Sequence, residues 1–131
     1  MSKQITTSPS NRKISALYKD IKRENLILQP DFQRRFVWNN KHKEKFIDTI
    51  LEGYPVPEIY VAQRGIDIET IETEEVVVDG QQRLHTIVEY IDEAEESKVF
   101  GNIVKKYKNL SKDEKEDFVN YTLLIRDLGD I

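Results

Sequence analysis

The sequence contains no cysteine among its 131 residues. Disulfide bonds, thiolate metal sites and a cysteine nucleophile are therefore all excluded. Glycine and proline are sparse, with five and four residues, which argues against a disordered or fibrous chain. No apolar run approaches the roughly 18 residues needed to span a bilayer. We expect a globular cytoplasmic protein with no membrane partner.

Charge is abundant but does not strongly favour one sign. Charged residues make up 34% of the chain, and the net charge of -4 argues against a general nucleic-acid binder. The charge is uneven along the chain, however. Residues 32–45 carry a formal charge of +4, and residues 66–75 carry -5. An acidic chain can therefore still present a basic face.

The length fits one domain and is too short for two. Residues 1–10 are polar, and we expect a flexible tail there, followed by a domain over residues 11–131. The patterns predict helices over 11–24, 41–52, 81–93 and after Ser111, and strands over 26–28, 59–62, 75–78 and 121–126, with a hairpin over 64–75. Three consecutive valines predict a strand that is buried on both faces. This order indicates an α+β or mixed α/β domain around a small sheet.

The segment VVVDGQQRLHT, residues 76–86, is typical of a buried strand that turns into a helix. Gly80 permits a sharp turn, and the first amides of the helix are a ready phosphate site. Arg83 lies about one turn into the helix and can point back to bind phosphate bidentately. Gln81 and Gln82 add uncharged donors and acceptors. Asp79 can hold a metal-bound water, act as a base or orient Arg83.

A structural interpretation of the same turn is equally open. Asp79 would then cap the helix, Gly80 would only form the turn, and the Gln and Arg side chains would lie on a solvated face. A short Asp-Gly turn is a weak motif by itself.

A second group of candidates is the segment PDFQRRFVW, residues 30–38. Phe32 and Trp38 require burial or stacking, whereas Gln33, Arg34 and Arg35 can bind phosphate, carboxylate or base edges. The structural alternative is that the aromatic residues anchor the core and the arginines pair with the acidic residues 69–75. The two histidines show no spacing that indicates a metal site.

These two blocks together resemble a known family. QPDFQRRFVWNNKHKEKFIDTILEGYPVPEIYV followed by VVVDGQQRLHTI is similar to the N-terminal domain of GmrSD-type, modification-dependent restriction enzymes. That family is related to the ParB and sulfiredoxin-like superfamily. The resemblance implies an α+β fold of ParB/sulfiredoxin-like type, a small mixed sheet flanked by helices, and a role in phage defence.

The resemblance also implies roles for named residues. NTP hydrolysis, with Mg²⁺ and GTP or ATP as the expected cofactors, is tied in such proteins to the positions of Asp79, Gly80, Gln81, Gln82 and Arg83. The Gln-Arg pair of the first block carries over to Gln33 and Arg34. Most relatives have a proline next, where this chain has Arg35.

Relatives commonly carry an H-N-H-type nuclease domain and extend beyond the last predicted strand. The sequence given stops at Ile131, so the domain is expected to be either a shortened form or a piece of a longer protein. Cleavage of DNA by this chain alone is therefore not expected, and NTP hydrolysis stays an open question. Three hypotheses follow: a nucleotide-phosphate-binding regulatory domain, a non-catalytic DNA-binding or adaptor module, and a metal-dependent nuclease using Asp31 and Asp79.

Overall fold

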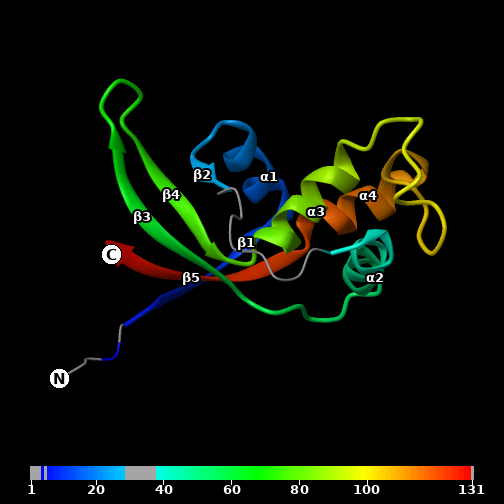
Figure 1. The fold of residues 1–131 in the computed structure, drawn as a ribbon, viewed down its shortest axis with the longest axis horizontal. Coiled ribbons are helices and arrows are strands. Elements are labelled where there is room, and N and C mark those ends of the chain that lie inside the picture. Colours follow the sequence, from blue (N-terminus) through cyan, green and yellow to red (C-terminus); the bar gives the residue numbers. More distant parts are fainter. Residues whose placement is uncertain (1–3, 5, 29–37, 131) are drawn as a thin grey trace.

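A five-stranded mixed sheet in the order β1-β5-β3-β4-β2 is the frame of the protein (Figure 1). The computed structural model describes residue 4, residues 6–28 and residues 38–130. β1 and β5, like β3 and β4, are antiparallel, whereas β3 and β5, like β2 and β4, are parallel. The elements are β1 Ser8–Lys13, α1 Ile14–Lys22, β2 Leu26–Ile27, α2 Asn40–Leu51, β3 Ile59–Asp67, β4 Glu72–Asp79, α3 Gln81–Ile91, a 3₁₀ turn Tyr107–Asn109, α4 Lys112–Asn120 and β5 Thr122–Asp130. The expectation of an α+β fold with a mixed sheet is confirmed.

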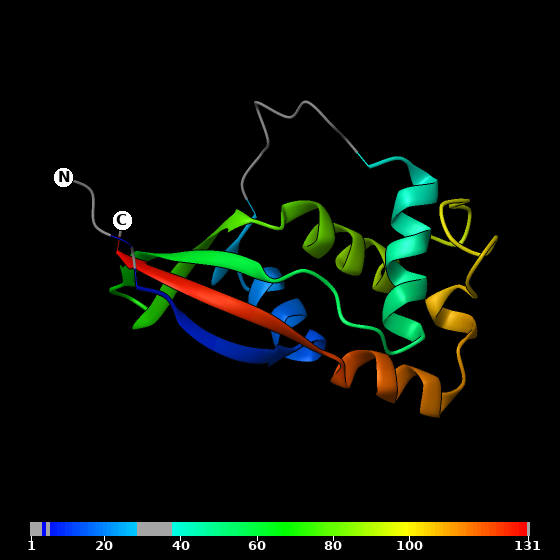
Figure 2. The same ribbon diagram turned by 90° about the horizontal axis from the view of Figure 1, so that it is seen from below.

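Helices α2, α3 and α4 lie together toward one end of the sheet, whereas the β3–β4 hairpin extends from the opposite end (Figure 2). Helix α1 lies beside the middle of the sheet, next to β1 and β2. One apolar core joins the helices to the sheet, and its fully buried members include Ile14, Leu17, Ile47, Ile59, Val61, Val77, Leu84, Leu123 and Ile125. None of the described helices is both long and apolar enough to cross a membrane.

Capping residues explain why α2 and α4 begin where they do. The Asn39 side chain accepts the amide of His42 at 2.9 Å, and Ser111 accepts the amide of Glu114 at 3.1 Å. In both helices the third residue also bonds back to the amide of the cap, which completes a capping box. The predicted helices over these segments are confirmed within one residue at their starts.

The beginning of the chain differs from the prediction. Ser8–Lys13 forms strand β1 along β5, so the end of the expected tail belongs to the sheet, and the first helix starts at Ile14 rather than at Asn11. This strand has no apolar alternation because it is a polar edge strand held mainly by backbone pairing. Arg12 also binds both carboxylate oxygens of Glu75, at 2.7 and 3.0 Å. Glu75 is one of the acidic residues that the structural alternative paired with Arg34 and Arg35, and it is bound to Arg12 instead.

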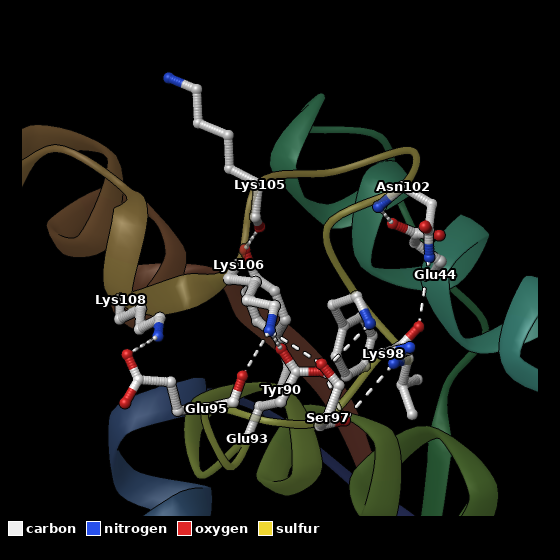
Figure 3. Close-up of polar contacts among 12 residues, drawn as sticks. Glu44, Tyr90, Glu93, Glu95, Ser97, Lys98, Asn102, Lys105, Lys106 and Lys108 are labelled. Atoms are coloured by element: carbon white, nitrogen blue, oxygen red, sulfur yellow. Dashed lines mark hydrogen bonds and ion pairs between the residues drawn. The ribbon is translucent and has the colours of Figure 1, made fainter.

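A buried carboxylate fixes the long connection between α3 and α4. The Glu44 Oε2 atom accepts the backbone amides of Asn102, Ile103 and Val104 at 2.7, 2.5 and 3.0 Å (Figure 3). Glu44 is only 3% exposed. Burial by itself would raise the pKa of Glu44, but the three amide bonds outweigh it and lower the pKa below its ordinary value.

Tyr90 on α3 is the second anchor of this connection. Its ring packs edge-on against Phe100, Tyr107 and Phe118, with centroids 4.9, 5.8 and 5.2 Å away. Its hydroxyl donates to the carbonyl of Lys105 at 2.6 Å. The ring contacts and the hydroxyl bond join α3, the connection and α4 into one body.

Substitution Glu44→Gln should lower the free energy of unfolding at neutral pH by about 1.5–3 kcal/mol, because the amides lose a charged acceptor. A carboxyl whose pKa is lowered on folding stabilises the protein above its unfolded-state pKa, and that stability is lost as the pH falls through the folded-state pKa. The gap between wild type and Glu44→Gln in urea denaturation should therefore be constant above about pH 5 and should close below about pH 4. Glu52→Gln, an exposed acid that ends α2, is the control. An equal gap for Glu52→Gln, or a gap that does not change with pH, would contradict this account.

The tip of the β3–β4 hairpin contains a strained isoleucine. Ile71 has a φ of 59°, in the left-handed region, and is 80% exposed. A side chain with a branched Cβ is rare in that region. Its neighbour Ile68 is 89% exposed and has a negative φ. The two residues thus differ in backbone conformation while both lack burial.

Substitution Ile71→Gly should raise the free energy of unfolding by up to about 1 kcal/mol, because relief of left-handed strain exceeds the added entropy of glycine. Ile68→Gly should lower the free energy of unfolding by about 0.5–1 kcal/mol, since the added glycine entropy is not offset by any relief of left-handed strain. Thermal unfolding of both variants checks the difference. Equal destabilisation by the two glycines would rule out strain at Ile71.

Candidate functional site at the start of α3

The turn from β4 into α3 is built on Gly80. Asp79 ends β4, Gln81 begins α3, and Gly80 caps the helix with a φ of 106°. A Cβ at Gly80 would lie 2.4 Å from the Ile59 Cδ1 atom, far inside the contact distance of about 3.5–4 Å. The predicted strand, turn and helix are confirmed. Glycine is required here both by conformation and by the close approach of β3.

A β-bulge immediately before the turn changes the exposure of its residues. Tyr60 pairs with Asp79, but the next residue, Val61, pairs with Val77, so Val78 is the extra residue. Val78 is 46% exposed, whereas Val77 is fully buried. The prediction that all three valines are buried on both faces is therefore wrong, because successive strand residues point to opposite faces and the face that carries Val78 is exposed here. Asp79 is also exposed at the mouth of the turn.

A small hollow opens at the turn, with a volume of about 230 Å³. Trp38 and the continuous segment 78–83 line it. Two larger hollows, of about 470 and 530 Å³, lie elsewhere and contain none of the predicted site residues. Sites that enclose a whole small molecule measure about 300–1,000 Å³. The hollow therefore matches one part of a ligand, such as a phosphate group, better than an entire nucleotide.

Arg83 folds back onto the turn, as predicted. Its Nη2 atom lies 3.2 Å from the position of a Gly80 Cβ and donates to the carbonyl of Glu58 at 3.0 Å. Burial lowers the pKa of Arg83, and the charge of Asp79 opposes that change. An arginine nevertheless stays charged in proteins. Its Nε atom is buried without a hydrogen-bond partner in the described part of the chain.

The two glutamines are held differently. The side-chain oxygen of Gln81 is buried and has no partner among the described residues. The Gln82 Oε1 atom accepts the backbone amide of Trp38 at 3.4 Å, and the Gln82 carbonyl accepts the Thr86 hydroxyl at 2.7 Å. Gln82 therefore ties the start of α3 to the segment that leads into α2. Buried polar groups without partners are uncommon in native structures, and those of Gln81 and Arg83 need an explanation.

Trp38 is the one described residue of the second predicted block that reaches the site. It lines the hollow, and its ring packs on Phe46 with centroids 5.3 Å apart. The other predicted residues of that block, Phe32, Gln33, Arg34 and Arg35, lie outside the described residues, as does Asp31.

No group of three or more acidic or histidine side chains within the described residues could hold a metal ion. His42 completes the capping box of α2 by accepting the Asn39 amide, and His85 is exposed on α3. Among the described residues that line the hollow, Asp79 is the one carboxylate.

Sequence patterns did not reveal Glu58, Tyr60 and Arg126, which adjoin the turn. The backbone carbonyl of Glu58 accepts a hydrogen bond from Arg83. Its carboxylate accepts hydrogen bonds from the Tyr60 hydroxyl at 2.6 Å and from the Arg126 Nε at 2.8 Å. The pKa of Glu58 is lowered, first by the bond from Tyr60 and then by that from Arg126. These residues meet only through the pairing of β3 with β4 and β5, and neither strand carries a sequence signal that could have indicated the contact.

The family comparison covers most of the chain. The sequence model of the GmrSD restriction endonuclease N-terminal domain matches residues 14–128. This chain belongs to that family. The membership associates this GmrSD N-terminal domain with a DNA restriction system. No curated protein and no solved structure matches the chain significantly, so kinship with ParB and sulfiredoxin folds stays a prediction.

Substitution Gly80→Ala should lower the stability of this GmrSD N-terminal domain more than Gly53→Ala. Both glycines have positive φ, but a Cβ at Gly53 would meet nothing within 4 Å. Gly53→Ala should therefore show only the left-handed cost of about 1–2 kcal/mol, and Gly80→Ala should add about 1–3 kcal/mol for the collision with Ile59. Urea denaturation of the two variants measures the difference. Equal losses would show that the close approach of β3 does not constrain the turn.

Proposed function

We propose that this domain binds the phosphate groups of a nucleotide at the start of α3. The observation that carries the proposal is the half-buried Arg83 guanidinium, held against Gly80 beside the hollow. The first amides of a helix have no intrahelical partners and carry partial positive charge. An anion in the hollow would meet these amides and the arginine together.

Burial favours this use of Arg83. A guanidinium that has lost part of its water gains more from an anion than an exposed one, because the surrounding dielectric constant is lower. Its bond to the Glu58 carbonyl fixes its direction in advance, which reduces the entropy lost on binding. An anion in the hollow would also give the Arg83 Nε–H a partner.

Asp79 fits a role beside a nucleotide-bound magnesium ion. Mg²⁺ is usually held by one or two protein carboxylates together with substrate phosphates and water, so a single carboxylate at the hollow is compatible with it. When bound, the metal would neutralise phosphate charge. If hydrolysis takes place at this site, orienting the attacking water would fall to Asp79, the carboxylate at the mouth of the turn.

Isothermal titration of GTP and ATP with magnesium tests the proposal. Wild type should bind at least one of them, and Arg83→Ala should weaken that binding by about tenfold or more, as expected for a lost charged hydrogen bond. Arg64→Ala removes an exposed arginine of β3 outside the hollow and should bind like wild type. Absence of binding by wild type, or equal affinity of wild type and Arg83→Ala, would refute the proposal.

A further inference from the structure

A row of polar side chains leads away from the turn across three strands. Tyr60 of β3 pairs with Asp79 of β4 on one side and with Arg126 of β5 on the other. Paired residues of neighbouring strands present their side chains on the same face of a sheet. Neighbouring strands are about 4.8 Å apart, so the row covers about 10 Å between its outer backbones. The surface beside the hollow thus continues from Asp79 toward Arg126.

Glu58 connects the two arginines at the ends of this surface. Its backbone carbonyl accepts a hydrogen bond from Arg83, and its carboxylate accepts one from Arg126. Arg126 also donates from Nη1 to the Thr7 hydroxyl at 3.3 Å. An arginine has five N–H donors, and these two bonds use one on each of two nitrogens. Arg126 is therefore oriented by its neighbours and retains donors for a ligand.

Stability alone gives little reason for this arrangement. The side chains of Arg126 and Glu58 are 33% and 31% exposed, and ion pairs at such exposure add little to folding. Their geometry, in contrast, places a second fixed cation one strand beyond Tyr60. Phosphate ligands with several charges are commonly held by more than one oriented cation.

We propose that Arg126 is a second phosphate-binding residue of this site, specific for ligands that carry more than one phosphate. One phosphate lies in the hollow at Arg83, and a further phosphate of the same ligand contacts Arg126. Glu58 is a positioning residue, since it orients both guanidinium groups. This inference rests on the proposed function.

Inorganic tripolyphosphate and inorganic phosphate, titrated into the full chain at constant ionic strength, separate the two arginines. Arg126→Gln should weaken tripolyphosphate binding by about tenfold, the effect of one charged hydrogen bond, and should leave phosphate binding unchanged within about twofold. Arg83→Ala should weaken both anions. Arg64→Gln, an exposed cation on the distal part of β3, should weaken neither.

Substitution Glu58→Gln distinguishes direct contact from an indirect effect. It removes the same ion pair but keeps the Arg126 cation and the backbone carbonyl that holds Arg83. Tripolyphosphate affinity should then stay within about threefold of wild type, because the attraction between arginine and phosphate remains. A loss as large as that of Arg126→Gln would show that Arg126 acts only through Glu58, and would overturn the inference.

The two proposals fail in different ways. If wild type binds neither anion nor nucleotide, the proposed function itself is wrong. If wild type binds tripolyphosphate and Arg83→Ala abolishes it, but Arg126→Gln binds it like wild type, the phosphate site stands and only the role of Arg126 is refuted.

Discussion

The close approach of Gly80 to Ile59 is the constraint on which the rest of the structure depends. The chain leaves β4 through a left-handed residue, and a Cβ at that residue would collide with the Ile59 side chain of β3. α3 starts directly from this point, so its buried face, with Leu84, Ile87 and Tyr90, is aimed at the core from its first turn. Tyr90 in turn anchors the connection to α4.

The same constraint arranges the polar side of the turn. The guanidinium of Arg83 can lie against Gly80 because no Cβ occupies that space. The bulge at Val78 turns Asp79 outward beside it, and the Glu58 carbonyl, immediately before β3, accepts a hydrogen bond from the guanidinium. A chain with a net charge of -4 thereby places the Arg83 cation beside the first amides of α3. The local electrostatic field there matters more than the net charge of the chain.

The basic stretch that suggested DNA binding is partly neutralised where the structure describes it. Lys43 pairs with Glu89 of α3 at 2.8 Å. Lys41 and Lys45 remain exposed on α2. The Lys43–Glu89 pair fixes α2 against α3 and leaves a weaker basic face on α2 than the sequence indicated.

Local signals predicted most of the elements, because periodicity and capping act over a few residues. Ser111 marked a helix start, Gly80 marked the turn, and the position of Arg83 one turn later correctly predicted its direction. Strand β1 was missed because its pairing with β5 joins residues more than 100 positions apart and needs no apolar side chain. The same limitation concealed the bulge at Val78 and the contact of Glu58 with Arg126, since strand register decides both.

Backbone amide NMR during a titration with magnesium-GTP tests the central claim most directly. The account predicts that the largest shift changes belong to the amides of residues 80–83 and to the Nε–H of Arg83, because these donors would face the phosphate. Smaller changes should follow at Tyr60 and Arg126. Changes concentrated on α2 or on the tip of the β3–β4 hairpin, with residues 80–83 unaffected, would contradict it.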